Sequence, residues 1–499
     1  MGLTENILAG LSTAELKALE KTCLPGTDSQ PGFLFALLLK YGDEEDKVTN
    51  RFKKEWPRGN LSVVRTQLNQ LILGGLYRLY AKDEPAAEVN ELIYQTQFFA
   101  KKSAYDIAVK LLDRAQDIAE ENELFPQLSE LLDLRLLFYQ TRILSDESGK
   151  RETVKQIKEV MLKQQNRMEY QLLVFEQMEW LHQSFMLRTP EGLAKFEAIL
   201  KSPLMEAESN ALSIKARIDY FILRGQYFSI SNQFERASES LQMLVDLLDE
   251  NPAIKKQRNL TYFSTYSQLA TYGYILKDAA RMEHAIGAIE QSPKYSEIDR
   301  IGAATLLINT KLAYYDLLKD KKGLYETVLE ARDLLRIHAS KLKPDVRATL
   351  LLTVISTFVE LGEYDEVLVL MREFAPFIYS NERVDIKVYL FFYELIAQLE
   401  IGNELIVNDT LQNFNRFMLR NEFKSAFERV MVQFLKIVSS AKPDMKGDLK
   451  QLLEQLRELP EKSLLDQNRV MFDILENLIQ SRIAGKKFHE FLREAGKRG

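Results

Sequence analysis

Four histidines are the residues of this sequence best suited to hold a transition metal, but their spacing does not form a site. His182, His284, His338 and His489 each lie more than 50 residues from the next. Two histidines bind zinc from one helix when they are four residues apart, and no HExxH motif occurs. We therefore expect no bound metal, and we interpret each histidine as an ordinary surface or interface residue.

Motifs for nucleotide binding and nucleophilic catalysis are also absent from the sequence. The closest approach to a phosphate-binding GxxxxGK[ST] loop, at Gly485-Lys486-Lys487, lacks the first glycine and the hydroxyl residue. No GxGxxG or GxSxG motif occurs, and we interpret the lone cysteine, Cys23, as a buried structural thiol. We therefore expect no cofactor and no enzymatic activity. An enzyme whose site is assembled from distant helices stays open as a further possibility.

The elements that must position any site are predicted to be helices. The 499 residues include only 21 glycines and 13 prolines, about half the usual share of these two helix breakers. From Phe234, apolar residues follow at offsets of 3, 7, 10, 11 and 14, which places them on one face of a helix. No alternation of apolar and polar residues between hairpin turns indicates a strand. The sequence therefore predicts an all-α protein of roughly twenty helices.

One layout of residues recurs along the chain. Phe221, Gly225 and Phe228 belong to a first helix, a polar turn follows, and Ala237 marks where a second helix approaches the first closely. Four later segments share this layout, and their residues at the position of Ala237, which we call the crossover residues, are Met282, Leu324, Val367 and Val407. The spacings between crossover residues are 45, 42, 43 and 40 residues. Because one helix pair cannot bury its apolar stripe alone, we expect such pairs to stack in series.

This layout resembles a degenerate tetratricopeptide repeat (TPR), with a period of about 40–45 residues that exceeds the strict 34 and approaches that of HEAT units. The resemblance implies a right-handed α-solenoid of stacked antiparallel helix pairs. The segments LSTAELKALEK, FLFALLLKYGDEEDK and ILENLIQSRIAGKKFHEFLRE are similar to those of large, uncharacterised bacterial TPR-like proteins that have a small helical N-terminal region. That similarity implies a cytoplasmic location and brings no catalytic residues.

A groove is the functional surface that the TPR resemblance implies, because the first helices of such arrays line a concave face that binds extended peptides. Counting from the crossover residues, we predict that seven residues face this groove: Asp219, Gln226, Ser229, Ser264, Ser267, Thr271 and Tyr274. Small polar side chains with one aromatic suit the recognition of a peptide backbone. A merely hydrated inner surface is the alternative for any single one of them.

Four ranges are predicted as the domain organisation. They are a small helical N-terminal region at 1–85, the first part of the helical array at 86–204, the TPR-like array at 205–422 and capping C-terminal helices at 423–499. In the first range we expect four helices, near 12–23, 31–41, 43–54 and 61–82. The last of these could read DNA through Arg65, Gln67, Asn69 and Gln70. However, residues 1–85 include 11 basic and 11 acidic residues. Their net charge is therefore zero, which does not favour binding to phosphates.

Charge and cysteine content limit the partners and the compartment. The net charge is −6, so nucleic acid is not the expected partner, and a lone cysteine fits a reducing cytoplasm. The longest apolar run, at 33–39, is too short for a membrane span. We therefore predict a non-enzymatic scaffold or adaptor that binds a protein or peptide. The alternative is a regulatory protein whose N-terminal helices contact nucleic acid while the array acts as a sensor. The oligomeric state and the identity of the partner are not predicted.

Overall fold

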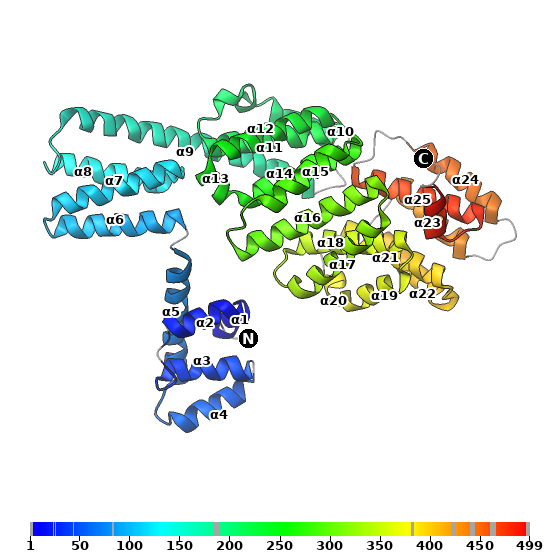
Figure 1. The fold of residues 1–499 in the computed structure, drawn as a ribbon, viewed down its shortest axis with the longest axis horizontal. Coiled ribbons are helices and arrows are strands. Elements are labelled where there is room, and N and C mark those ends of the chain that lie inside the picture. Colours follow the sequence, from blue (N-terminus) through cyan, green and yellow to red (C-terminus); the bar gives the residue numbers. More distant parts are fainter. Residues whose placement is uncertain are drawn as a thin grey trace. The chain divides into compact units, whose positions relative to one another are not determined.

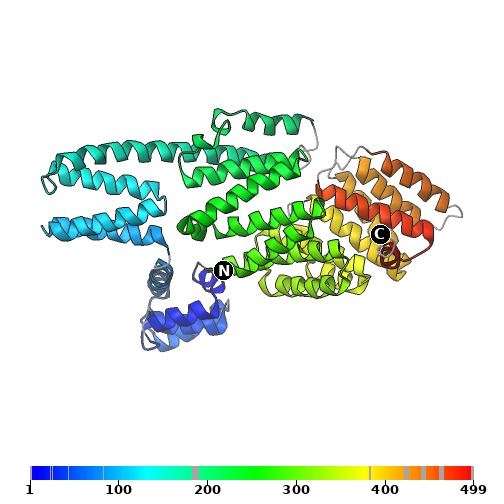
Figure 2. The same ribbon diagram turned by 45° about the horizontal axis from the view of Figure 1, so that its top comes forward.

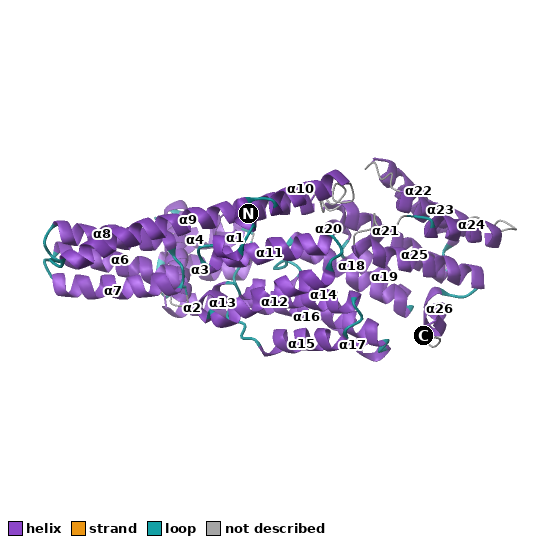
Figure 3. Ribbon diagram, turned by 90° about the horizontal axis from the view of Figure 1, so that it is seen from above, coloured by secondary structure: helices purple, strands orange, loops and turns teal. Residues whose placement is uncertain are grey.

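The structure is a computed structural model that describes residues 3–22, 24, 26–42, 44–81, 84–182, 190–380, 384–420, 426–439, 445–459 and 466–495. Over these ranges the protein is all-α: every regular element is a helix and no strand occurs (Figure 3). The lone cysteine, Cys23, lies outside the described residues. None of the described helices combines the length and the apolar character that crossing a bilayer requires.

The chain folds as two compact units, Met1–Gln165 and Asn166–Gly499. The first unit contains these helices (Figure 1): α1 (Leu3–Ala9), α2 (Thr13–Thr22), α3 (Gln30–Tyr41), α4 (Glu45–Glu55), α5 (Leu61–Tyr80), α6 (Pro85–Lys101), α7 (Tyr105–Glu121) and α8 (Phe125–Gln140). A long helix, α9 (Glu147–His182), continues through the boundary into the second unit. The four ranges inferred from the sequence divide the chain by pattern and stay a prediction.

The second unit contains most of the helices. They are α10 (Pro190–Leu200), the 3-10 turns η2 (Pro203–Met205) and η3 (Glu208–Asn210), α11 (Ile214–Ile230), α12 (Phe234–Glu250), α13 (Pro252–Gln257), α14 (Asn259–Ile275), α15 (Ala279–Gln291), α16 (Glu297–Leu318), α17 (Lys321–His338), α18 (Pro344–Leu361), α19 (Tyr364–Glu373), α20 (Ala375–Ser380), α21 (Val384–Ile401), α22 (Glu404–Arg420), α23 (Ala426–Ser439), α24 (Met445–Arg457), α25 (Asp466–Ala484) and α26 (Phe488–Ala495).

The first unit has two separate hydrophobic cores. One core is formed by the five helices α1 through α5, and its fully buried side chains include Leu34, Phe52 and Leu68. The other joins α6, α7 and α8 around Leu112 and Leu131. The helices found at α2, α3, α4 and α5 confirm the four expected from the sequence, whereas α1 was not expected. A helix of seven residues makes barely two turns, too few to show a helical period.

Helix pairs follow one another in the second unit. The helix α11 packs on α12, α12 on α14, α14 on α15, and this succession continues through α16, α17, α18, α19, α21 and α22 (Figure 2). The first helices of successive pairs also contact each other, since α14 packs on α16 and α18 packs on α21. Two large apolar clusters run through this unit, one from Tyr170 to Ala303 and one from Ile301 to Phe488. Each pair therefore buries its apolar faces against its neighbours.

The crossover residues occupy one structural position. Each is the fourth residue of its helix, in α12, α15, α17, α19 and α22 respectively. Four of them are at most 3% exposed, and the fifth, Leu324, is 9% exposed. The five crossover residues therefore share one position in their helices and are all buried.

The turn that precedes each crossover residue is also repeated. The residue five positions before it has a positive φ in every case, and these residues are Asn232, Lys277, Lys319, Gly362 and Gly402. In each turn the next N–H donates to the carbonyl five residues earlier, as Asp278 does to Gly273 at 2.7 Å. This is the Schellman closure of a helix, which requires the left-handed region and is easiest for glycine. The same turn thus sets the start of each second helix.

These turns generate a stability prediction. A β-carbon built at Gly402, where φ is +88°, would meet no atom within 4 Å, so Gly402→Ala should cost only the left-handed backbone, about 1 kcal/mol. Lys277→Gly, at φ +58°, should stabilise the protein by up to about 1 kcal/mol for the same reason. Urea denaturation of both variants measures the two changes. If both variants changed the free energy of unfolding in the same direction, the left-handed backbone would not explain the effects.

Candidate functional site

The structure places the seven predicted groove residues on two first helices. Three of them lie on α11 and four on α14. Thr271 is exposed, Asp219 is only 7% exposed, and the other five are half-buried. The predicted set is therefore not a uniform hydrated surface, because its members differ strongly in burial.

Two of the predicted residues join neighbouring helices through their side chains. The Thr310 hydroxyl of α16 donates to Ser267 Oγ at 3.2 Å. The Tyr274 hydroxyl donates to Asp316 Oδ2 on α16 at 2.6 Å. In contrast, the hydroxyl of Thr271 is bonded within α14, to the Ser267 carbonyl at 3.0 Å. A row of polar groups thus continues from α14 onto α16.

Asp219 is a buried carboxylate without a hydrogen-bond partner for Oδ2. Burial raises its pKa to about 6, although Arg258 and Arg167 oppose the shift. Gln226, seven residues further along the same helix face, also has a buried side-chain oxygen without a hydrogen-bond partner. Buried acceptors of this kind carry a desolvation cost, which a donor group would relieve. Because these two oxygens have almost no exposed surface, a bound group would reach them only after neighbouring side chains move.

Glu360 and Asp316 extend this polar row and were missed by sequence reasoning. Glu360, on α18, is half-buried, and its pKa is raised to about 8 by burial and by the nearby Asp316, while Lys319 opposes the shift. Lys319 pairs with Asp316 at 3.2 Å. The pKa of the Tyr274 hydroxyl is raised, first by burial and then by Asp316. Counting eight residues back from Leu324 would have found Asp316, because the same count from Met282 finds Tyr274.

The chemistry of this row is hydrogen bonding and charge. Within the described ranges, no three or more side chains of His, Cys, Asp and Glu are grouped so as to hold a metal ion. Two histidines of the second unit pack against tyrosines: His284 lies edge-on to Tyr266, and His489 lies 3.2 Å from the Tyr364 hydroxyl. The row offers carboxylates, hydroxyls and an amide, which can bind donors such as peptide N–H groups.

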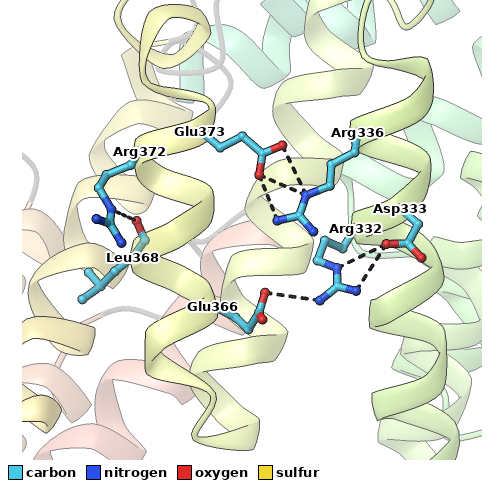
Figure 4. Close-up of polar contacts among 7 residues, drawn as sticks. All are labelled: Arg332, Asp333, Arg336, Glu366, Leu368, Arg372 and Glu373. Atoms are coloured by element: carbon cyan, nitrogen blue, oxygen red, sulfur yellow. Dashed lines mark hydrogen bonds and ion pairs between the residues drawn. The ribbon is translucent and has the colours of Figure 1, made fainter.

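The second helices carry a different surface. Between α17 and α19, Arg332 pairs with Glu366 at 3.3 Å and Arg336 pairs with Glu373 at 2.9 Å (Figure 4). Figure 4 also shows that Arg372 points away from these pairs and donates to the Leu368 carbonyl. Partly exposed ion pairs contribute about 1 kcal/mol or less each, so these residues can be changed with little loss of stability.

The residues considered for DNA reading lie on α5. Arg65 is held by two carboxylates, Glu5 at 3.1 Å and Glu45 at 2.7 Å. An open hollow of about 640 Å³ lies beside it and is also lined by Lys53 and Arg58. Gln67 and Gln70 are exposed, while Asn69 is half-buried. The arginine that would bind phosphate is thus already neutralised from within the first unit.

The raised pKa of Glu360 generates a prediction on stability and pH. Above its ordinary value of 4.5 the unfolded chain loses this proton, while the folded chain keeps it until about pH 8. The glutamate therefore destabilises the fold increasingly as the pH rises from about 4.5 to about 8. Glu360→Gln should leave the melting temperature nearly unchanged at pH about 5 and raise it at pH about 8.5.

Differential scanning fluorimetry across this pH range measures the effect. Glu330→Gln, at an exposed position of α17, is the control for the loss of one surface charge. A gain in melting temperature that is equal at both pH values would contradict the burial of Glu360.

Comparison with known proteins leaves the function to be argued from these residues. No protein-family model matches the chain, and no curated protein matches it in sequence.

Proposed function

We propose that the second unit is a TPR-like, right-handed α-solenoid whose first helices bind an extended peptide segment of a partner protein. In this proposal the protein is a scaffold or adaptor and not an enzyme, and it acts in the cytoplasm, where a chain with one cysteine needs no disulfide. The observation that carries the proposal is the polar row that runs from α14 onto α16 and α18, through Ser267 with Thr310, Tyr274 with Asp316, and Glu360.

The period of the contacts supports the solenoid. Hydrogen bonds between successive pairs join residues 42 to 44 positions apart in four places: Arg281 to Ser238, Thr310 to Ser267, Tyr274 to Asp316 and Lys341 to Glu297. In a stack of equivalent units, a contact between neighbours recurs at the repeat length. These four separations agree with the spacing of the crossover residues, whereas the pairs Arg332–Glu366 and Arg336–Glu373 between α17 and α19 span 34 and 37 positions.

The packing of the first helices supports their position on the inner side of a curve. The helix α14 contacts α16, α16 contacts α18, and α18 contacts α21, whereas among the described residues neither α11 with α14 nor the second helices with each other make comparably extensive contacts. A layer whose helices lie closer together is the concave layer of a curved stack. The polar row is then placed where such stacks bind extended segments.

The chemistry of the row supports a peptide as the ligand. Asp219 and Gln226 have acceptor oxygens without a partner, and Ser264 and Ser267 add hydroxyls. An extended peptide presents N–H groups along its length, which match a row of acceptors better than a compact ligand does.

Panning a phage library of random dodecapeptides on the full chain tests this proposal. We expect enriched peptides whose affinity falls by about 10- to 100-fold in the variant Gln226→Ala, Thr271→Ala, Tyr274→Phe, because each lost hydrogen bond is worth about 1 kcal/mol. The affinity is measured by fluorescence polarisation with the selected peptides.

The matched control changes the second helices. Glu366→Gln with Glu373→Gln removes the acceptors of the ion pairs shown in Figure 4 and should leave the peptide affinity unchanged. Circular dichroism verifies that both variants are folded. If no peptide is enriched, or if both variants lose affinity equally, the inner row is not the binding surface.

The alternative, a regulator with a nucleic-acid-contacting N-terminal region, makes a separate prediction. Because Arg65 is held by two carboxylates and residues 1–85 have no net charge, we expect no binding of mixed-sequence DNA or RNA even at about 20 mM salt. Fluorescence anisotropy with labelled oligonucleotides measures this. Binding that weakens steeply with added salt and is lost in Arg58→Ala with Lys53→Ala would instead favour the alternative.

A further inference from the structure

A small hollow of about 180 Å³ lies between α15 and the helix that follows it, α16. This α15–α16 hollow is lined by Ile289, Lys294, Arg300, Ala303, Ala304 and Leu307. Four of these six side chains are aliphatic, two are basic, and none belongs to the polar row. Pockets for drug-sized ligands usually measure about 300–1,000 Å³, so the hollow suits a smaller molecule.

The aliphatic side chains form the floor of the α15–α16 hollow. Ile289 and Ala303 are buried, while Ala304 and Leu307 are half-buried and keep some exposed surface. Two successive alanines on α16 leave space there that larger side chains would fill. An aliphatic group placed in this space would exchange contact with water for contact with four aliphatic side chains, which is favourable.

The two basic side chains of the hollow differ in how they are held. The Lys294 ammonium donates to the carbonyls of Ile289 and Glu290, both at 2.7 Å, and its third N–H remains for another acceptor. Burial lowers the pKa of Lys294, while Glu290 opposes the shift. Arg300 is exposed and has no hydrogen bond or ion pair among the described residues.

The acidic residues nearest along the chain already have other partners. Glu290 pairs with Lys311 at 2.6 Å, and Glu297 pairs with Lys341 at 2.7 Å. The carboxylate of Asp299 accepts from a backbone N–H and from a side-chain amide, each at 3.2 Å. No acidic side chain lines the hollow itself. Its two cations therefore lie beside an aliphatic floor without a carboxylate of their own.

We propose that the α15–α16 hollow binds an aliphatic carboxylate, with its apolar end on the four aliphatic side chains and its carboxylate at Lys294 and Arg300. An arginine can hold a carboxylate through two parallel hydrogen bonds, and a lysine adds a third. Such a carboxylate occurs in short-chain fatty acids and at the end of a protein whose last residue is aliphatic. This inference is independent of the peptide-binding function proposed above.

Ligand-observed NMR titration of the full chain, at about 50 mM salt, tests the two parts of the ligand separately. Along the series acetate, butyrate and hexanoate, the affinity should rise about four-fold for each methylene that becomes buried. Hexanoate should reach a dissociation constant of about 0.1 to 1 mM. Hexanamide has the same tail without the charge and should bind about 10-fold more weakly than hexanoate.

Two results of this titration would overturn the proposal. Equal affinities for acetate and hexanoate would show that the aliphatic floor takes no part in binding. Equal affinities for hexanoate and hexanamide would show that the two cations take no part.

Two variants place the ligand in the hollow. Arg300→Gln should weaken hexanoate binding about 10-fold, because a charged hydrogen-bond donor is lost. Ala304→Leu fills the hollow and should weaken hexanoate while leaving acetate unchanged. The matched control is Arg372→Gln, an exposed arginine that donates within its own helix α19. Circular dichroism verifies that all three variants are folded. An equal effect of Arg300→Gln and Arg372→Gln would contradict the assignment.

A short peptide that ends in a free leucine carboxylate distinguishes the two sources of the ligand. If this peptide binds about 10-fold more tightly than hexanoate, the hollow recognises the end of a protein chain. If hexanoate binds more tightly, it recognises a free fatty acid. The same peptide with an amidated C-terminus should lose this affinity, and equal binding of the amidated and the free peptide would overturn the proposal.

Discussion

The close approach of two helices across one recurring turn is the contact on which the second unit depends. At the turn between α14 and α15, a β-carbon at Gly273 would lie 2.9 Å from Cγ of the crossover residue Met282, so the two helices touch with no room between them. A left-handed residue and a Schellman bond close each of the five first helices that precede a crossover residue, and the second helix starts directly after them. An apolar face that one helix pair leaves open is covered by the helix that follows, as α14 and α15 are by α16.

A polar row follows from the same repetition. Residues 42 or 43 positions apart on the neighbouring helices α14 and α16 lie in contact, as Ser267 and Thr310 or Tyr274 and Asp316 do. Neighbours that share a confined surface lose water, and the loss raises the pKa of Glu360 and Asp219 toward neutral values. These polar side chains are therefore also partly buried. Hydrogen bonds are stronger in such a place than in water, so a ligand that lacks a matching donor would bind less tightly.

The helix α9 combines buried side chains with large exposed apolar ones: in the second unit, Met168, Leu172 and Phe175 are 58, 61 and 60% exposed. Its buried face is anchored by Tyr170 and Gln177, while the methionines and Phe175 of the opposite face remain exposed. Methionine is flexible and polarisable, and it suits surfaces that pack against another helix.

The sequence by itself determined the helical class, four helices of the N-terminal region and the five crossover residues, because these depend on local periodicity and on turn chemistry within a few residues. It identified Tyr274 and Asp219 by counting along the repeat, but not that Asp219 is buried or that Tyr274 binds Asp316. It also missed the short helices, such as α1, whose few turns show no period. The pairing of Tyr274 with Asp316, the raised pKa of Glu360 and the exposure of Met168 and Phe175 on α9 were decided by tertiary structure alone. Each of them depends on which helices become neighbours, and contacts between residues some 40 positions apart leave no mark on the local pattern.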